Sequence, residues 1–179
     1  NFNNDEVEVV IPANSLYDEI CFKYSKKNKT SWAFSNIHSI HNSDVPLHYN
    51  YQLSLVPLNL PLHLQSKAVI VAVSTKGSIR SANESKFENG AVIANLSEFG
   101  DYAIAVDTIA PKITPLNFNN GKDVSGHKFI SLKISDNLSG IKSYNAYLND
   151  IWILMEYDQK NNLLIYNFDK NMVPGLNAF

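Results

Sequence analysis

The stretch Val45-Pro46-Leu47-His48-Tyr49-Asn50-Tyr51-Gln52-Leu53-Ser54-Leu55 decides the fold class, because apolar and polar side chains alternate along most of it. Successive side chains of a strand point to opposite faces of a sheet. The segment therefore predicts a strand with one buried and one solvated face.

Other short apolar segments recur along the chain, and none shows the periodicity of an amphipathic helix. Residues 68–73 are apolar throughout, which predicts a central strand covered on both faces. An aromatic content of 11% also favours sheet. We therefore predict an all-β protein. The remaining predicted strands are 7–11, 21–24, 91–96, 102–106, 129–134, 142–148, 151–157 and 163–168. Residues 26–29 are predicted to form a loop. Asn149-Asp150 is predicted to be a two-residue hairpin turn within a meander of the last three strands.

A domain boundary is expected between Asp107 and Pro111, where one set of strands gives way to another. Pro111 restricts the backbone to extended conformations, as a stiff linker or a first strand requires. We predict two tandem β-sandwich (immunoglobulin-like) domains, 1–107 and 108–179. Tyr102 lies in a segment that resembles the tyrosine-corner strand of such sandwiches, so it is predicted to anchor the first core. Trp152, in an apolar strand, is predicted to anchor the second.

The second domain is short for an immunoglobulin-like fold. A constant-type domain has roughly 100 residues and seven strands, whereas about five strands are apparent before residue 171. We predict an incomplete or minimal sandwich, in which Leu176–Phe179 begins a further strand. Because an uncovered sheet edge tends to pair with another chain, we expect association through this domain or a disordered end.

Composition excludes several function classes. The net charge is −2 and no basic block is present, which argues against nucleic acid as the main partner. No apolar run approaches the roughly 20 residues of a membrane-spanning helix. The polar start of the chain shows no signal peptide, and a trimmed protein would begin in the same way. The single Cys21 cannot form an intrachain disulfide and is predicted to be a small buried hydrophobe.

We identify no catalytic, cofactor-binding or metal-ligating set of residues. A zinc site needs three or four converging ligands, and the spacing of His38 and His41 brings two imidazoles together on a helix but not on a strand. His48 and His63, with Asp44 nearby, are likewise interpreted as ordinary solvated or loop residues. The remaining candidates are also weak. The carboxylate pairs Asp5-Glu6 and Asp18-Glu19 are adjacent in sequence and would point to opposite faces of a strand. A nucleophile elbow is missing, and residues 136–140 suit a turn better than a calcium loop.

Two aromatic residues are candidate ligand contacts. Trp32 follows a basic loop and suits either packing or sugar stacking, and Tyr51 is the second aromatic considered for a sugar face.

Three segments resemble the C-terminal region of bacterial lysostaphin-like zinc metallopeptidases. They are Tyr102-Ala103-Ile104-Ala105-Val106-Asp107-Thr108-Ile109-Ala110-Pro111, Ser135-Asp136-Asn137-Leu138-Ser139-Gly140-Ile141 and Trp152-Ile153-Leu154-Met155-Glu156-Tyr157-Asp158. Ile11-Pro12-Ala13-Asn14-Ser15-Leu16-Tyr17 is similar to the first β-sandwich module of that region. In that family the modules follow a peptidase domain that cuts cell-wall cross-links. The zinc signature of the peptidase, a His and an Asp four residues apart and a later H-x-H, does not occur here. Relatives continue past Gly175 through a further strand, whereas this sequence ends at Phe179.

The resemblance implies an accessory region of a periplasmic, cell-surface or secreted bacterial protein, with the enzyme domain upstream. We therefore expect a non-catalytic structural or binding module that positions or targets a neighbouring domain of the same polypeptide. Cell-wall or surface glycan is a further expected partner. The alternative is a carbohydrate-binding module that uses exposed aromatic residues such as Trp32 and Tyr51. A stand-alone hydrolase is the least favoured interpretation.

Overall fold

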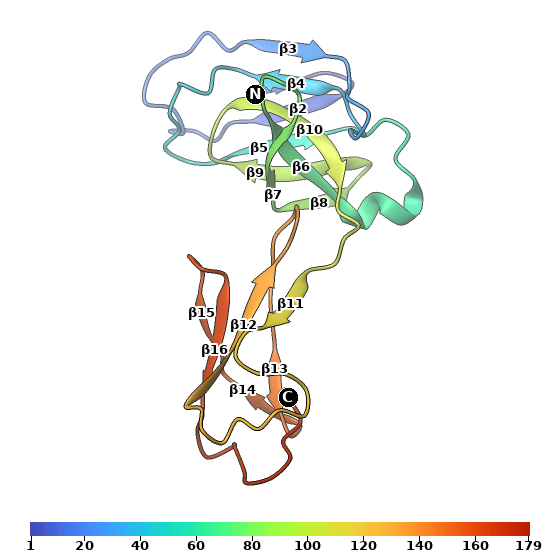
Figure 1. The fold of residues 1–179 in the computed structure, drawn as a ribbon. Helices are drawn as coiled ribbons and strands as arrows, with labels where there is room; N and C mark the ends of the chain where they lie inside the picture. The colour runs from blue at the N-terminus through green and yellow to red at the C-terminus, as the bar shows by residue number, and fades with distance from the viewer. The chain divides into compact units, whose positions relative to one another are not determined.

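The computed structural model describes all 179 residues and confirms the all-β prediction (Figure 1). The chain divides into two compact units, Asn1–Thr108 (unit 1) and Ile109–Phe179 (unit 2). A single 3-10 helix, Leu62–Lys67, interrupts the strands, and no helix of the chain is long and apolar enough to cross a membrane. The strands of unit 1 are β1 (Phe2–Asn3), β2 (Val7–Val10), β3 (Tyr24–Lys27), β4 (Ile37–Ile40), β5 (Tyr51–Leu55), β6 (Ala68–Val73), β7 (Ile79–Asn83), β8 (Ser85–Glu88), β9 (Ala91–Leu96) and β10 (Gly100–Val106). The strands of unit 2 are β11 (Lys112–Pro115), β12 (Phe129–Ser135), β13 (Ala146–Leu148), β14 (Ile151–Ile153), β15 (Glu156–Asp158) and β16 (Leu163–Asn167).

Unit 1 is built from two five-stranded antiparallel sheets. One has the order β1-β2-β5-β9-β8 and the other β3-β4-β10-β6-β7. The apolar face predicted for β5 is confirmed, since Leu53 and Leu55 are fully buried opposite Val9 and Val7 of β2. The predicted solvated face is wrong within the strand, because Ser54 is also buried and Gln52 is partly buried. β6 is buried along its whole length, as its continuous apolar sequence predicted.

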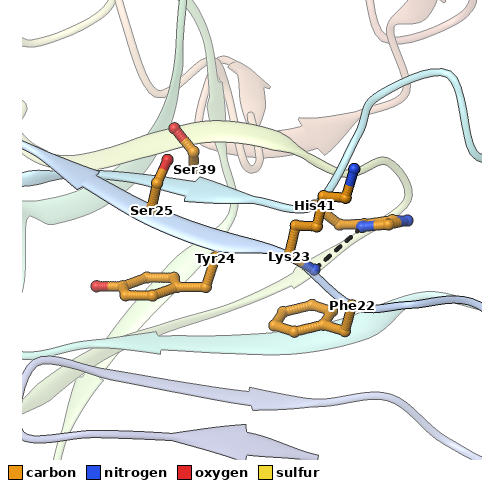
Figure 2. Close-up of a pocket in the computed structure, with 6 residues that line it drawn as sticks. All are labelled: Phe22, Lys23, Tyr24, Ser25, Ser39 and His41. Atoms are coloured by element: carbon orange, nitrogen blue, oxygen red, sulfur yellow. Dashed lines mark hydrogen bonds between the residues drawn. The ribbon is translucent and has the colours of Figure 1, made fainter.

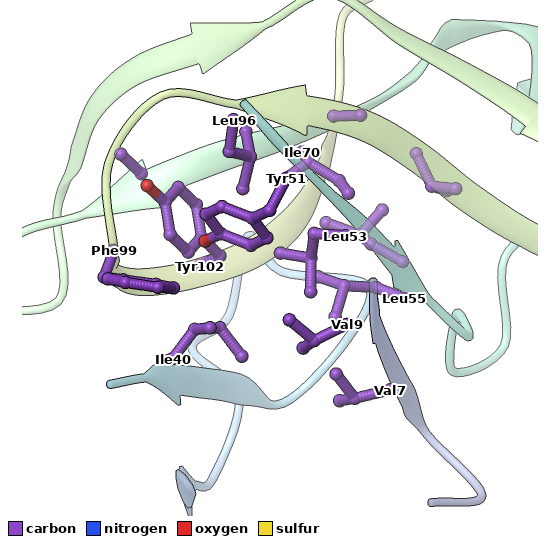
Figure 3. Packing of buried hydrophobic residues seen from close by; sticks show 14 of the residues in the cluster. Val7, Val9, Ile40, Tyr51, Leu53, Leu55, Ile70, Leu96, Phe99 and Tyr102 are labelled. Atoms are coloured by element: carbon purple, nitrogen blue, oxygen red, sulfur yellow. The ribbon is translucent and has the colours of Figure 1, made fainter. Parts of the chain in front are cut away.

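The core of unit 1 lies between these sheets and holds large aromatic rings as well as aliphatic side chains (Figure 3). Tyr102 is 2% exposed, which confirms that it anchors this core. Its hydroxyl donates a hydrogen bond to the backbone oxygen of Glu98, four residues earlier, over 2.7 Å. This is the arrangement of a tyrosine corner, which ties the start of a strand to the loop before it.

Two local predictions for unit 1 are wrong. Residues 45–50 do not form a strand, and Tyr49 is 55% exposed because Pro46 and the turns around it interrupt pairing before β5 begins. Cys21 is exposed rather than buried, because it lies in the loop before β3. That strand itself includes Lys26 and Lys27, which were predicted to lie in a loop.

Unit 2 places a four-stranded sheet of order β11-β12-β16-β15 opposite a two-stranded sheet of β13 and β14. In chain order this is the A-B-E-D sheet of an immunoglobulin-like sandwich facing only its C and C′ strands. The small core between them consists of Ile130, Leu132, Ile134, Leu148, Ile153, Met155, Leu164 and Tyr166.

The predicted continuous strand 151–157 is two strands in different sheets. β14 pairs with β13 through the two-residue turn Asn149-Asp150, as predicted, whereas β15 pairs with β16. The chain therefore crosses from one sheet to the other at Leu154 and Met155 instead of continuing a three-stranded meander. Unit 2 gains a second layer in this way.

Trp152 is not a core anchor, because its side chain is 54% exposed. Its neighbour Ile153 is 3% exposed and takes the buried position of β14. Adjacent strand residues face opposite sides, and the apolar sequence of this strand did not show which side faces the core. The predicted strand at Leu176–Phe179 does not form. Instead, Ala178 accepts a hydrogen bond from the backbone N–H of Asn149 over 2.8 Å.

Candidate functional site

The candidate site of unit 1 lies where the edges of its two sheets, β1-β2 and β3-β4, approach one another. The ring of Phe2, on β1, lies 5.4 Å from that of Phe22 and 4.7 Å from that of Tyr24, measured between centroids. Phe22 also stacks on His41, whose ring meets the buried Phe99 edge-on. These aromatic contacts connect the open side of the sandwich to its core.

A shallow pocket lies over β3 and the end of β4 (Figure 2). Phe22 and Tyr24 point to one side of β3, whereas Ser25 and Ser39 point to the other. His41 adopts a positive φ of 52° and accepts a hydrogen bond at Nδ1 from the backbone N–H of Lys23 over 3.3 Å. His41 is therefore bonded to the backbone of the chain, whereas the Tyr24 hydroxyl bonds to the side chain of His38.

Glu6, in the loop before β2, is the centre of a polar network beside this pocket. Lys26 Nζ lies 2.6 Å from its Oε1, and Asn36 Nδ2 donates to its Oε2 over 2.9 Å. These two hydrogen bonds hold the pKa of Glu6 below its usual value, and the carboxylate in turn raises the pKa of Lys26. The network links β2 of one sheet to β3 and β4 of the other.

His38 of β4 is the buried member of the network, with no exposed surface. Its Nδ1 lies 3.0 Å from the hydroxyl of Tyr24, and its Nε2 lies 3.9 Å from Glu6 Oε2 without a hydrogen-bond partner. Burial lowers the pKa of His38 to about 4, an effect that the Glu6 carboxylate only partly opposes. The imidazole is therefore neutral at physiological pH, and a ring proton on Nε2 lets Tyr24 donate to Nδ1.

The sequence analysis did not predict this network. His38 was interpreted as solvated or in a loop, which is wrong because β4 places it between the sheets. Glu6 was considered only for its adjacency to Asp5. Its partners Lys26, Asn36 and His38 are 20 to 32 residues away, and only the pairing of β3 with β4 brings Lys26 opposite His38.

The other titratable residues singled out from the sequence do not converge. His48 and His63 are exposed, and Asp44 lies on an exposed turn. No group of three or more His, Cys, Asp or Glu side chains is arranged to hold a metal ion. Cys21 is free and exposed, and it does not belong to the network around Glu6.

The two candidate sugar contacts differ in accessibility. Tyr51 is completely buried in the core of unit 1, next to Phe99, so it cannot stack on a ligand and that assignment is wrong. Burial also raises its pKa. Trp32 is partly buried, and its indole N–H donates to the backbone oxygen of Gly77 over 3.3 Å. Its ring therefore fixes one loop against another.

Unit 2 carries an exposed pair of aromatic residues on one hairpin. Tyr147 and Trp152 are direct partners across β13 and β14, and they are 53% and 54% exposed. The indole N–H of Trp152 donates to Asn145 Oδ1 over 3.4 Å, so the amide lies on the same outer face. The sequence signal for this pair was present, because both residues flank the predicted Asn149-Asp150 turn at equal distances.

These features define a β-sandwich protein whose first unit carries a polar network between its two sheets. The family model of the Zu5-like domain matches residues 1–107, and the chain belongs to this family. The match covers nearly the whole of unit 1, Asn1–Thr108. No curated protein and no solved structure matches the chain.

Proposed function

We propose that this chain is a non-catalytic structural and binding module of a secreted or cell-envelope bacterial protein. It positions or targets a neighbouring domain of the same polypeptide. That domain is a peptidase of the lysostaphin-like metallopeptidase family, whose accessory region the sequence resembles. Cell-wall or surface glycan is the further partner in this proposal.

The non-catalytic part of the proposal rests on the burial of His38, the histidine that lies beside a carboxylate. Glu6 and His38 are the one histidine–carboxylate contact within 4 Å in the structure, and they face each other at the junction of two sheets. His38 has no exposed surface, so its free Nε2 cannot reach a substrate. A general base must lie within hydrogen-bond reach of the proton that it removes. The arrangement therefore supports a structural role for this pair.

Sedimentation of the full chain with purified bacterial cell-wall sacculi tests the proposal. We expect saturable binding to the sacculi and no release of labelled wall fragments, with or without added zinc. Release of fragments that depends on His38 would contradict the non-catalytic assignment. A chain that stays in the supernatant with every sacculus preparation would contradict the targeting role.

A second candidate function, carbohydrate binding, is favoured by the exposed pair Tyr147 and Trp152. Aromatic faces bind the apolar faces of sugars, and the nearby Asn145 amide supplies hydrogen-bonding groups. Titration of a Trp32→Phe variant with cell-wall oligosaccharides would follow the fluorescence of Trp152 alone. A concentration-dependent change that is lost on Tyr147→Ala supports this function, and a flat titration contradicts it.

A further inference from the structure

Three exposed aromatic rings of unit 1 lie in contact with one another at its surface. Tyr17 is 65% exposed, Tyr49 is 55% exposed, and His48, which contacts both, is exposed as well. The rings of Tyr17 and His48 meet edge-on with their centroids 5.6 Å apart. Those of His48 and Tyr49 also meet edge-on, at 4.3 Å. These three residues are called the aromatic triad below.

The backbone that carries the triad is held from the side of the core. Leu16 and Leu47 form an isolated antiparallel bridge, and both pack against the core of unit 1. Tyr17 and His48 are the residues that follow these two leucines. The backbone N–H of His48 also donates to the backbone oxygen of Ser15 over 2.8 Å. Because the two segments are already joined, a ligand would not have to order them on binding.

The polar atoms of the triad are only partly used within the chain. The Tyr17 hydroxyl lies 3.3 Å from Nδ1 of His48. When this hydroxyl donates to Nδ1, the neutral imidazole carries its proton on Nε2 and can donate it to a ligand. Neither this Nε2 nor the hydroxyl of Tyr49 is hydrogen-bonded within the chain. The triad therefore combines exposed ring surface with free hydrogen-bonding groups.

The charges around the triad favour an uncharged ligand. Asp18 and Glu19 directly follow Tyr17, and both are exposed. The two segments that carry the triad, 11–19 and 42–50, contain no lysine or arginine. Anionic polymers are bound through lysine and arginine side chains, which neutralise their phosphates or carboxylates. A nucleic acid or a phosphate-rich polymer is therefore a poor match for this surface.

The size of the triad favours a small ligand unit over a folded protein. An aromatic side chain buries at most about 150–250 Å², and part of each tyrosine is already covered. Each partner of a stable protein complex buries roughly 800 Å², which is more than three such side chains supply. A pyranose ring has an apolar face that can cover one aromatic ring and polar groups at its rim. Aromatic surface with a few placed polar groups is the composition of small-molecule sites.

We propose that the aromatic triad binds the N-acetylhexosamine units of an uncharged glycan chain. One sugar ring stacks on an exposed tyrosine, and the hydroxyl and acetamido groups of the chain bond to Nε2 of His48 and to the hydroxyl of Tyr49. This site rests on the proposed function, because the strands of the cell-wall glycan are built from this class of sugar. It lies in unit 1 and uses none of the residues of the hairpin in unit 2.

The test titrates the isotope-labelled full chain with tetra-N-acetylchitotetraose, an uncharged chain of N-acetylhexosamines, and follows the backbone amides by NMR. Saturable shifts are expected at residues 15–17 and 47–49 and not in unit 2. Tyr49→Ala removes one ring and should weaken binding by about tenfold or more. Tyr17→Phe keeps the ring but removes the hydroxyl that orients His48, so binding should weaken about two- to tenfold. Tyr157→Ala removes a tyrosine of unit 2 that is 40% exposed and, as the matched control, should bind within about twofold of the wild type.

The position of the shifts on the wild-type chain does not depend on the folding of any variant. No saturable shift, shifts confined to unit 2, or equal affinities of Tyr49→Ala and the wild type would each overturn the proposal. Sedimentation with sacculi separates this proposal from the proposed function. Sacculus binding that Tyr49→Ala leaves unchanged would overturn the triad as the site and leave the targeting role standing. A chain that binds the chitotetraose through the triad but binds no sacculus would support the sugar site and contradict the targeting role.

Discussion

Both units are β-sandwiches, but they differ in the size of their sheets and of the core between them. Unit 1 encloses fifteen buried apolar residues between two five-stranded sheets, whereas unit 2 encloses eight between a four-stranded and a two-stranded sheet. Of the seventeen exposed large hydrophobic side chains, thirteen lie in unit 2, although it is the shorter unit. The comparison shows that unit 1 has the larger buried core and that unit 2 leaves more of its large hydrophobic side chains exposed.

The largest expected effect on stability comes from removing the aromatic anchor of unit 1. Tyr102→Ala deletes a ring that is 2% exposed and its hydrogen bond to Glu98, so it should destabilise unit 1 by about 3–5 kcal/mol. Calorimetry should show the loss in the transition of unit 1 only. Tyr102→Phe keeps the ring and should cost about 1 kcal/mol. A shift of both transitions by the same amount would show that the units do not unfold independently.

The stability of unit 1 should depend on pH through the buried histidine of its polar network. His38 has a folded pKa of about 4 and an unfolded value of about 6.5, so the unfolded chain binds more protons between these limits. Stability should therefore be complete above pH 6.5 and fall as the pH decreases toward 4, by up to about 3 kcal/mol. Urea unfolding across this range measures the effect.

His38→Gln should flatten the profile between pH 6.5 and 4. The contribution of Glu6 behaves differently, because its pKa is lowered on folding and its stabilisation is lost only at lower pH, as the carboxylate becomes protonated. His63→Gln is the matched control, since it removes an exposed histidine without touching the sandwich. An unchanged slope in His38→Gln would show that another group titrates in this window.

Much of the fold follows from local patterns, and the candidate site follows from long-range register. The apolar run of β6 and the Asn149-Asp150 turn were predictable because burial on both faces and positive φ each leave a mark within a few residues. The Glu6–His38 contact was not, because the two residues are 32 positions apart and only the packing of two sheets joins them. The exposure of Trp152 was missed for a related reason. An apolar strand in a thin, two-stranded layer shows no alternation that would identify its outer face.

The smallest expected effect provides the sharpest check on unit 2. Trp152→Ala removes a large aromatic side chain, and a core tryptophan would cost about 3–5 kcal/mol on such a change. The side chain of Trp152 is 54% exposed and bonded only to the exposed Asn145, so the stability of unit 2 should change by no more than about 0.5 kcal/mol. Ile153→Ala in the same strand is the matched control and should cost about 2–5 kcal/mol, because that side chain is 3% exposed. Thermal unfolding of both variants measures the difference. Equal losses would place Trp152 in the core and remove the basis for treating the outer face of the hairpin as free for a ligand.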